Sequence, residues 1–250
     1  MSDERTPEDM VQECREDAAK MQEKFAAQAA LEEHRNNLSK KRRSFAIARA
    51  IIQRGKSAGI PDKYIRVKRG ELESILCPTF HGDTKRFADL IYKSPELLFE
   101  KPFIVIDGGD PDSRKLAGYA ILFRMIACDK YGLSYDCGQL SSEFQTIRNQ
   151  GGNRNDLVER LKKQGALFIN EFHPRKFNIH LPDSANFFDQ LLGERSDYSK
   201  PTILTFSSPL ERGVTNLGNA IKDDRCGLYL SMLSHTDVKN NKKVFRIRVK

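Results

Sequence analysis

Residues 103–116 carry the residue types of a phosphate-binding loop at nearly its usual spacing. The apolar run FIVI at 103–106 is typical of a buried strand in a parallel sheet, and DGGDPDSRKL follows it at 107–116. A phosphate loop has the pattern Gly-x-x-x-x-Gly-Lys-Ser/Thr, in which backbone N–H groups and the lysine bind phosphates and the hydroxyl binds Mg²⁺. Aligned on Gly109, the lysine is kept as Lys115, whereas the second glycine is Arg114 and the hydroxyl is Leu116. The loop is therefore either a working nucleotide-binding loop or a relic that retains only the fold of one.

Two more polar segments follow apolar strands further along the chain. Asn170 and Glu171 come after the run at 166–169, and Thr205 and Ser207 lie at the end of the run at 202–206. The carboxyl ends of parallel strands meet at one edge of a sheet, where ligands bind. In phosphate-loop ATPases an aspartate at the first of these ends helps to hold Mg²⁺, so Asn170 removes a charge that a hard cation prefers. The sequence predicts poor ATP hydrolysis, and Mg²⁺ is not expected to bind well.

The alternation of strands and helices after residue 103 predicts an α/β fold with a parallel sheet covered by helices on both faces. Strands are expected at 103–106, 134–137, 166–169, 202–206 and, at an edge, 244–249; helices are expected at 114–131, 139–149 and 153–163. Upstream, the pattern predicts a helix from Thr6 to about residue 36, a second from Ser39 to Gly55, and short helices within 62–76 and 85–92. We expect a helical region at 1–76 and the α/β domain at 77–250.

The first predicted helix carries one narrow apolar stripe with intervals of three or four residues. Its positions are Met10, Cys14, Ala18, Met21, Phe25 and Ala29. A stripe this thin on so polar a helix either folds back on its own chain or docks on a partner helix, and the second arrangement fits the polarity better.

The charge of the chain changes sign along its N-terminal part. The net charge is +8, with a sequence pI near 9.2. Residues 1–39 carry ten acidic and five basic side chains, whereas residues 40–69 carry eleven Lys/Arg and one acid, Asp62. This change indicates an acidic helix that faces a partner and a basic segment suited to a polyanion such as nucleic acid. The alternative is a solvated helical hairpin whose two halves attract each other.

Cysteine and histidine usage argues against a disulfide framework or a metal site. The five cysteines, at positions 14, 77, 128, 137 and 226, form no Cys-x-x-Cys pair, and His173, His180 and His235 lack metal-ligand spacing. The N-terminus is polar and acidic, and no stretch approaches the length of a membrane span. We expect a cytoplasmic protein without a bound metal.

Several short motifs together resemble the DnaC/DnaI-type replicative helicase loaders, which share the fold of the AAA+ ATPases and of the IstB transposition helper. The motifs are GIPxxY at 59–64, the altered phosphate loop, the acidic strand end at 170–171, KPTILTxS at 200–207 and LGxxIxDDR at 217–225. The resemblance covers residues 45–235. It implies an AAA+-like domain at 77–250 with degenerate nucleotide-binding motifs.

The resemblance also implies roles for individual residues. It implies nucleotide binding by Gly109, Arg114, Lys115, Asn170, Ser207 and Arg225. It implies catalytic roles for Glu171 and for Arg195, which would reach the nucleotide of a neighbouring subunit. The helix at 140–148 lies where the loaders have an insertion that lines single-stranded DNA, which implies DNA contacts by Ser141, Ser142, Arg148 and Arg154. The N-terminal stripe, with Met10, Cys14, Met21 and Phe25, would bind a DnaB-type helicase.

Simpler interpretations of the same residues remain open. Lys115 could be a solvent-exposed lysine at a helix start, and Arg114 could bind an anion or pair with Asp110 or Asp112. Arg195 and Arg225 could form surface ion pairs, and the helix at 140–148 could be an ordinary amphipathic helix.

The leading hypothesis is a loader for a phage or mobile element that binds ATP or ADP weakly and assembles as a homo-oligomer or on the helicase. The alternatives are an active IstB-like ATPase that assists transposition and an inhibitor of host helicase loading.

Overall fold

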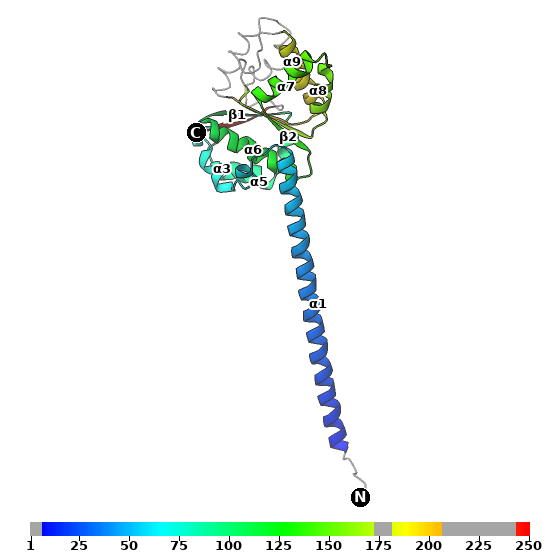
Figure 1. Ribbon diagram of the computed structural model, residues 1–250. Helices are drawn as coiled ribbons and strands as arrows, with labels where there is room; N and C mark the ends of the chain where they lie inside the picture. The colour runs from blue at the N-terminus through cyan, green and yellow to red at the C-terminus, as the bar shows by residue number, and fades with distance from the viewer. Residues whose placement is uncertain (1–6, 173–181, 207–243) are drawn as a thin grey trace. The chain divides into compact units, whose positions relative to one another are not determined.

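A computed structural model of the chain describes residues 7–172, 182–206 and 244–250 (Figure 1). Contacts divide the chain into two compact units, Met1–Ala50 and Ile51–Lys250. Among the described residues, no helix combines the length and the apolar composition that crossing a membrane requires.

The N-terminal region is one helix, α1 (Pro7–Ser57), of 51 residues. The predicted break between residues 36 and 39 is wrong. Neither Gly nor Pro occurs between Pro7 and Gly55, and residues such as Asn36 or Ser39 cost a helix interior only a few tenths of a kcal/mol, roughly. Arg54 and Lys56 in the last turn interact favourably with the negative end of the helix dipole. The chain leaves the helix through Gly59, whose φ is +81°.

The two members of the predicted apolar stripe whose side chains are described, Met21 and Ala29, are exposed to solvent. Met21 is exposed, and so are Leu31, Leu38, Phe45 and Ile47 further along the helix. The side chains of Met10, Cys14 and Phe25 lie outside the described part of the structure, so their predicted contact with a helicase stays a prediction.

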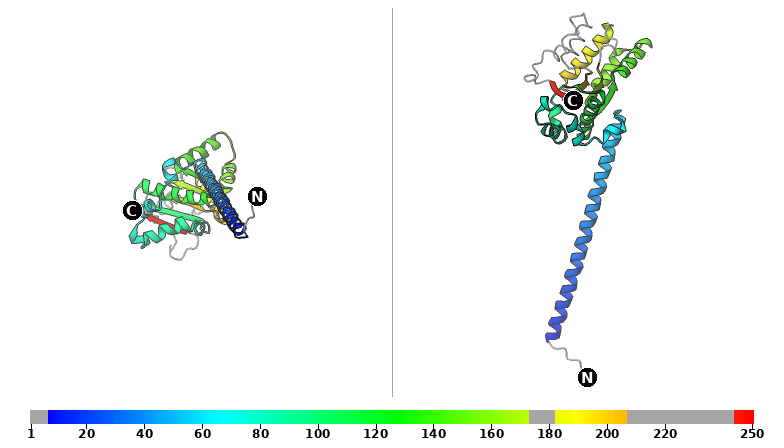
Figure 2. Two further views of the ribbon diagram at one scale, coloured as in Figure 1. Left: turned by 90° about the horizontal axis from the view of Figure 1, so that it is seen from below. Right: turned by 90° about the vertical axis from the view of Figure 1, so that its left-hand side faces the viewer.

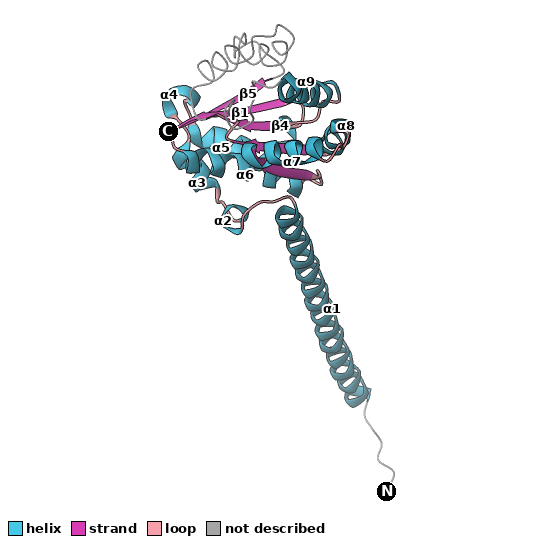
Figure 3. Cartoon of the chain, turned by 45° about the horizontal axis from the view of Figure 1, so that its top comes forward, coloured by secondary structure: helices cyan, strands magenta, loops and turns pink. Residues whose placement is uncertain are grey.

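The second unit is built on a five-stranded parallel sheet with the order β2-β3-β4-β1-β5 (Figure 3). The strands are β1 (Phe103–Gly108), β2 (Gly132–Asp136), β3 (Ala166–Asn170), β4 (Thr202–Thr205) and β5 (Val244–Val249). All five lie within two residues of the predicted positions. β5, drawn in red in Figure 2, forms one edge of the sheet, as predicted.

Helices cover both faces of the sheet (Figure 1). One face carries α7 (Cys137–Asn149), α8 (Arg154–Lys162) and α9 (Pro182–Asp197); the other carries α2 (Asp62–Ile65), α3 (Arg69–Ile75), α4 (Pro78–His81), α5 (Thr84–Lys93), the short 3₁₀ helix Pro95–Leu98 and α6 (Pro111–Ala127). Alternate residues of β1 enter the two cores, with Phe103 and Val105 in one and Ile104 and Ile106 in the other. Residues 103–106 of this central strand are buried on both faces and are therefore all apolar. The predicted α/β fold is confirmed.

Residues 58–76 belong structurally to this second unit. Ile60, Tyr64, Leu72 and Leu76 are buried in the same core as α6 and β1. The sequence analysis grouped them with the helical region at 1–76, whereas the packing unit begins at Ile51. The assignment of residues 1–76 to helicase binding stays a prediction.

Candidate functional site

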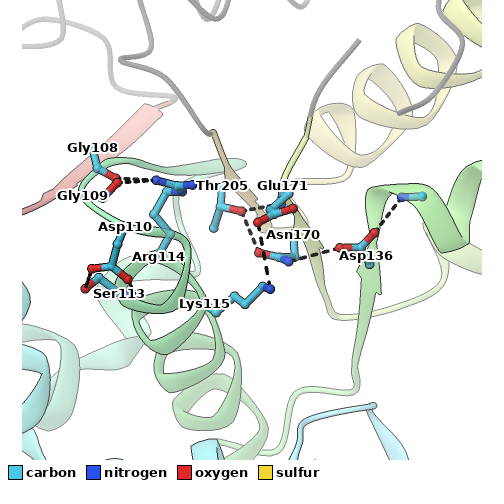
Figure 4. Close-up of polar contacts among 11 residues, drawn as sticks. Gly108, Gly109, Asp110, Ser113, Arg114, Lys115, Asp136, Asn170, Glu171 and Thr205 are labelled. Atoms are coloured by element: carbon cyan, nitrogen blue, oxygen red, sulfur yellow. Dashed lines mark hydrogen bonds and ion pairs between the residues drawn. The ribbon is translucent and has the colours of Figure 1, made fainter. Parts of the chain in front are cut away.

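The carboxyl ends of β2, β3 and β4 lie at one edge of the sheet, where their polar groups form hydrogen bonds with one another (Figure 4). The Thr205 hydroxyl donates to Oδ1 of the buried Asn170 (3.0 Å) and accepts from the backbone N–H of Glu171 (2.6 Å). Nδ2 of Asn170 donates to Oδ2 of Asp136 at 3.3 Å. Every described polar end in this row therefore has a partner from a neighbouring strand.

Asp136 is a member of this row that the sequence analysis missed. It is the N-cap of α7, and its Oδ1 accepts from the backbone N–H of Gly138 at 2.9 Å. The Asp136–Gln139 capping pair was the available signal, because a carboxylate three residues before a glutamine marks a helix start.

The loop after β1 is short, and its residue Asp110 forms the N-cap of the helix that follows. Asp110 caps α6, and its carboxylate accepts from the backbone N–H (2.9 Å) and the hydroxyl (2.6 Å) of Ser113. These bonds hold the pKa of Asp110 below its usual range, the hydroxyl contributing most. The helix starts at Pro111, three residues before the predicted start, because Asp110 and Pro111 form a favourable cap and first position. A carboxylate thus occupies the helix terminus at which a phosphate would bind.

Arg114 turns back into the loop instead of leaving room for a phosphate (Figure 4). Its guanidinium is buried, and Nη1 donates to the carbonyl oxygens of Gly108 (2.8 Å) and Gly109 (2.6 Å). A phosphate loop directs N–H groups at an anion, whereas this loop directs carbonyl oxygens at a cation. The hydrogen-bond partners of Arg114 are thus carbonyl oxygens of its own loop and not Asp110 or Asp112.

The backbone at the end of β5 packs directly on the two loop glycines. Gly108 and Gly109 have φ of +83° and +51°, and a Cβ on Gly109 would lie 1.9 Å from the carbonyl oxygen of Lys250. Beneath the loop, the buried Asp107 binds Arg246 and Arg248 of β5. Glycine is required here because another strand approaches, and no phosphate is needed to explain it.

Lys115 and Glu171 form a loose ion pair, with Nζ and Oε1 4.0 Å apart. Glu171 has a φ of +50°, in the left-handed region that non-glycine residues rarely adopt. Lys115 also lines a cavity of about 490 Å³ together with Lys63, Tyr64 and Asn170. Leu116, where a metal-binding hydroxyl would be, packs against the apolar core.

Arg195 is fully buried under the sheet, where its guanidinium makes four hydrogen bonds. The acceptors are the Thr202 hydroxyl (2.8 Å) and the carbonyl oxygens of Leu161 (2.7 Å), Gln164 (3.0 Å) and Pro201 (2.7 Å). Burial lowers the pKa of Arg195 to about 9. In this position Arg195 ties α8, α9 and β4 together, and reaching another subunit would require breaking all four bonds.

The predicted DNA-binding residues on α7 differ in their exposure. Ser141 is buried, whereas Ser142 and Arg148 are exposed, and the Ser142 hydroxyl donates to the carbonyl of Gly138 at 3.0 Å. Arg154 begins α8, but its side chain is outside the described part of the structure. Ser207 and Arg225 also lie outside the described residues, as do His173, His180 and His235.

Three solved structures are among those that the chain resembles. The first is AMPPCP-bound DnaA from Aquifex aeolicus, with 12% identity and a TM-score of 0.46 over 65% of this chain and 46% of that chain. The second is the DnaC helicase loader, with 13% identity and a TM-score of 0.46 over 67% of this chain and 90% of that chain. The third is DnaI, with 13% identity and a TM-score of 0.49 over 76% of this chain and 94% of that chain. This chain thus spans less than half of the DnaA chain. No protein-family profile and no curated protein matches it. DnaC and DnaI are the proteins that the sequence motifs resemble.

Proposed function

We propose that this protein is a helicase loader of the DnaC type, serving the DNA replication of a phage or mobile element without turning over ATP. It would bind a DnaB-type helicase through α1, and single-stranded DNA through its basic surfaces. The observation that carries the proposal is the buried Arg114 guanidinium, which binds the carbonyl oxygens of Gly108 and Gly109. The proposal is supported by a parallel sheet whose loop after β1 points these carbonyl oxygens at a cation of its own chain.

Three further features of the site argue against turnover. Phosphoryl transfer depends on a metal ion and on exact positioning of the phosphates. The Asp110 carboxylate would repel a phosphate at the start of α6, Leu116 offers no metal ligand, and both amide atoms of Asn170 are already bonded within the sheet. A nucleotide bound to this protein would therefore be held weakly.

Exposed basic side chains support a polyanionic partner. Residues 34–57 of α1 carry eight Lys/Arg and no acid. Phosphates of single-stranded DNA would be attracted to such a segment in a strongly salt-dependent way. Ser142 and Arg148, both exposed on α7, offer further contacts for the same ligand.

The test is co-elution with a DnaB-type helicase in size-exclusion chromatography. We expect a complex with the wild type and its loss in Met21→Asp/Phe25→Asp, with the far-UV spectrum unchanged. Failure of the wild type to co-elute with any candidate helicase would overturn the proposal. An unwinding assay then separates a loader, which stimulates the helicase, from an inhibitor, which suppresses it.

Nucleotide chemistry is tested separately by calorimetry and by a hydrolysis assay. We expect no ATP or ADP binding tighter than the millimolar range, and phosphate release at background with and without DNA. DNA-stimulated hydrolysis that disappears in Lys115→Ala would instead indicate an active ATPase of the IstB kind.

A further inference from the structure

We propose that α1 pairs in an antiparallel arrangement with α1 of a second copy of this chain, about a twofold axis between residues 29 and 30. The pairing itself is independent of the proposed function. It rests on an exposed apolar row, on the distribution of charge along α1 and on the register that brings the two together.

The exposed row lies in the second half of α1. Leu31, Leu38 and Phe45 follow one another at intervals of seven residues, and 55%, 42% and 76% of their surfaces are exposed. Residues seven apart lie on the same side of a helix, so these side chains form one line. Three large apolar side chains in line on a helix indicate a surface that another helix covers.

The charge of α1 is divided between its two halves. Residues 8–33 carry eight acidic and three basic side chains, whereas residues 34–57 carry eight basic and no acidic ones. A parallel pair would place each basic half beside its own copy, which like charges oppose. An antiparallel pair places the basic half of one copy beside the acidic half of the other, and this complementarity selects a second copy as the occupant.

One register aligns apolar positions across such a pair. If residue i faces residue 59 − i of the partner, Cys14 lies opposite the partner's Phe45 and Met21 lies opposite the partner's Leu38. Together with positions 17, 24, 35 and 42, these positions and the Gln28–Leu31 layer follow one another at intervals of three and four residues, as a single coiled-coil seam requires. Cys14 and Met21 of the N-terminal stripe thus meet the exposed C-terminal row, whereas Gln28 adds a polar layer beside Leu31.

The layers between these contacts contain charged residues of both kinds. Asp17 faces the partner's Arg42, which is attractive, whereas Lys24 faces the partner's Arg35, which is repulsive. A seam of this composition is weak and salt-sensitive, and its charged layers fix the register. If Cys14 and Met21 also bind a helicase, a consequence that rests on the proposed function, the helicase must displace the second copy.

Disulfide trapping tests the register directly. In a background with Cys77, Cys128 and Cys226 replaced by serine, Phe45→Cys is oxidised mildly beside the matched control Ile47→Cys. Ile47 is also exposed, at 61%, but lies on the opposite side of α1. We expect Phe45→Cys to form crosslinked dimers at least tenfold faster, with mass spectrometry identifying a bond between residues 14 and 45.

Equal crosslinking of the two variants, or a bond between residue 14 and residue 14 of the partner, would overturn the proposal. Analytical ultracentrifugation adds an independent measure. Asp17→Arg and Arg42→Asp should each weaken dimerisation, the double variant should restore it, and Lys24→Glu should tighten it roughly threefold to tenfold. A wild type that remains monomeric at high concentration and low salt would also overturn it.

Discussion

The edge of the sheet and the helix α1 differ in whether their side chains have partners within the chain. At the sheet edge, Arg114, Asn170 and Thr205 all bind groups of the same chain. Along α1, Leu38 and Phe45 are exposed and have no such cover. The polar groups at the sheet edge are satisfied within the chain, whereas the large apolar side chains on α1 are exposed to solvent. The contrast predicts that substitutions at the sheet edge change stability and that substitutions on α1 change association.

The largest expected effect is the loss of Arg195 inside the α/β unit. Arg195→Met keeps the length of the side chain but removes four buried hydrogen bonds, to three carbonyl oxygens and the Thr202 hydroxyl, although the Leu161 and Pro201 carbonyls keep a backbone donor. Because buried hydrogen bonds to a charged group are costly to lose, we expect the free energy of unfolding to fall by about 3–5 kcal/mol. Urea denaturation followed by circular dichroism measures this change.

Arg160→Met is the matched control on the neighbouring helix. Arg160 is half exposed and pairs with Glu143, so its loss should cost less than about 1 kcal/mol. If Arg195→Met were as mild as this control, Arg195 would not be a structural residue, and its predicted role at a neighbouring subunit's nucleotide would regain support.

The next effect concerns the loop that Arg114 fills. Arg114→Gly restores the glycine of a phosphate loop but removes the donor of two carbonyl oxygens, and we expect a loss of about 1–3 kcal/mol. Calorimetry should still detect no ATP binding, because Asp110 still caps α6 and Leu116 still offers no hydroxyl.

A combined variant sharpens this result. Arg114→Gly with Asp110→Gly and Leu116→Thr should gain measurable binding of MgATP, since the anion site and one metal ligand return together. Tight ATP binding by the single variant would show that Arg114 alone closes the site.

The positions of the strands, and the location of the polar motifs at one edge of the sheet, could be predicted from the sequence. The binding of Arg114 to the carbonyl oxygens of its own loop could not. Apolar runs such as 103–106 mark buried strands, and parallel topology brings their carboxyl ends to one edge wherever the side chains point. Arg114 binds the carbonyl oxygens of a loop against which Lys250 packs, and the sequence does not reveal this contact because Lys250 is distant from Gly109 in the chain. The continuity of α1 was missed because Asn36 and Ser39 resemble a stop and a cap, although no residue there breaks a helix.

A smaller effect is expected from His81, which joins α4 to β5. Burial lowers the pKa of His81, and the positive charge of Arg248 lowers it further. The hydrogen bond with the Arg248 backbone and the negative charge of Asp107 raise the pKa, but burial is the largest effect. The neutral ring accepts from the backbone N–H of Arg248 at 2.9 Å. Because the folded pKa lies below the unfolded value of about 6.5, this stabilisation is complete above that pH and is lost as the pH falls towards the folded pKa.

Urea denaturation between pH 5 and pH 8 measures this dependence. His81→Gln should flatten the part of the curve below pH 6.5, whereas His34→Gln on α1 controls for the removal of a histidine elsewhere. An unchanged curve in His81→Gln would assign the pH dependence to other groups.

The smallest expected effect is that of Phe45→Ser on stability, and it completes the contrast between the two regions. Phe45 is the most exposed of the described large apolar side chains on α1, so its loss should change the free energy of unfolding by no more than about 0.5 kcal/mol at low protein concentration. Phe144→Ser, which removes an equal side chain from the core between α7 and the sheet, should cost about 3–5 kcal/mol. A similar cost for both would mean that α1 is already covered within its own chain. A negligible cost for Phe45→Ser, joined to weaker self-association, would mean that this aromatic side chain contributes to binding and not to folding.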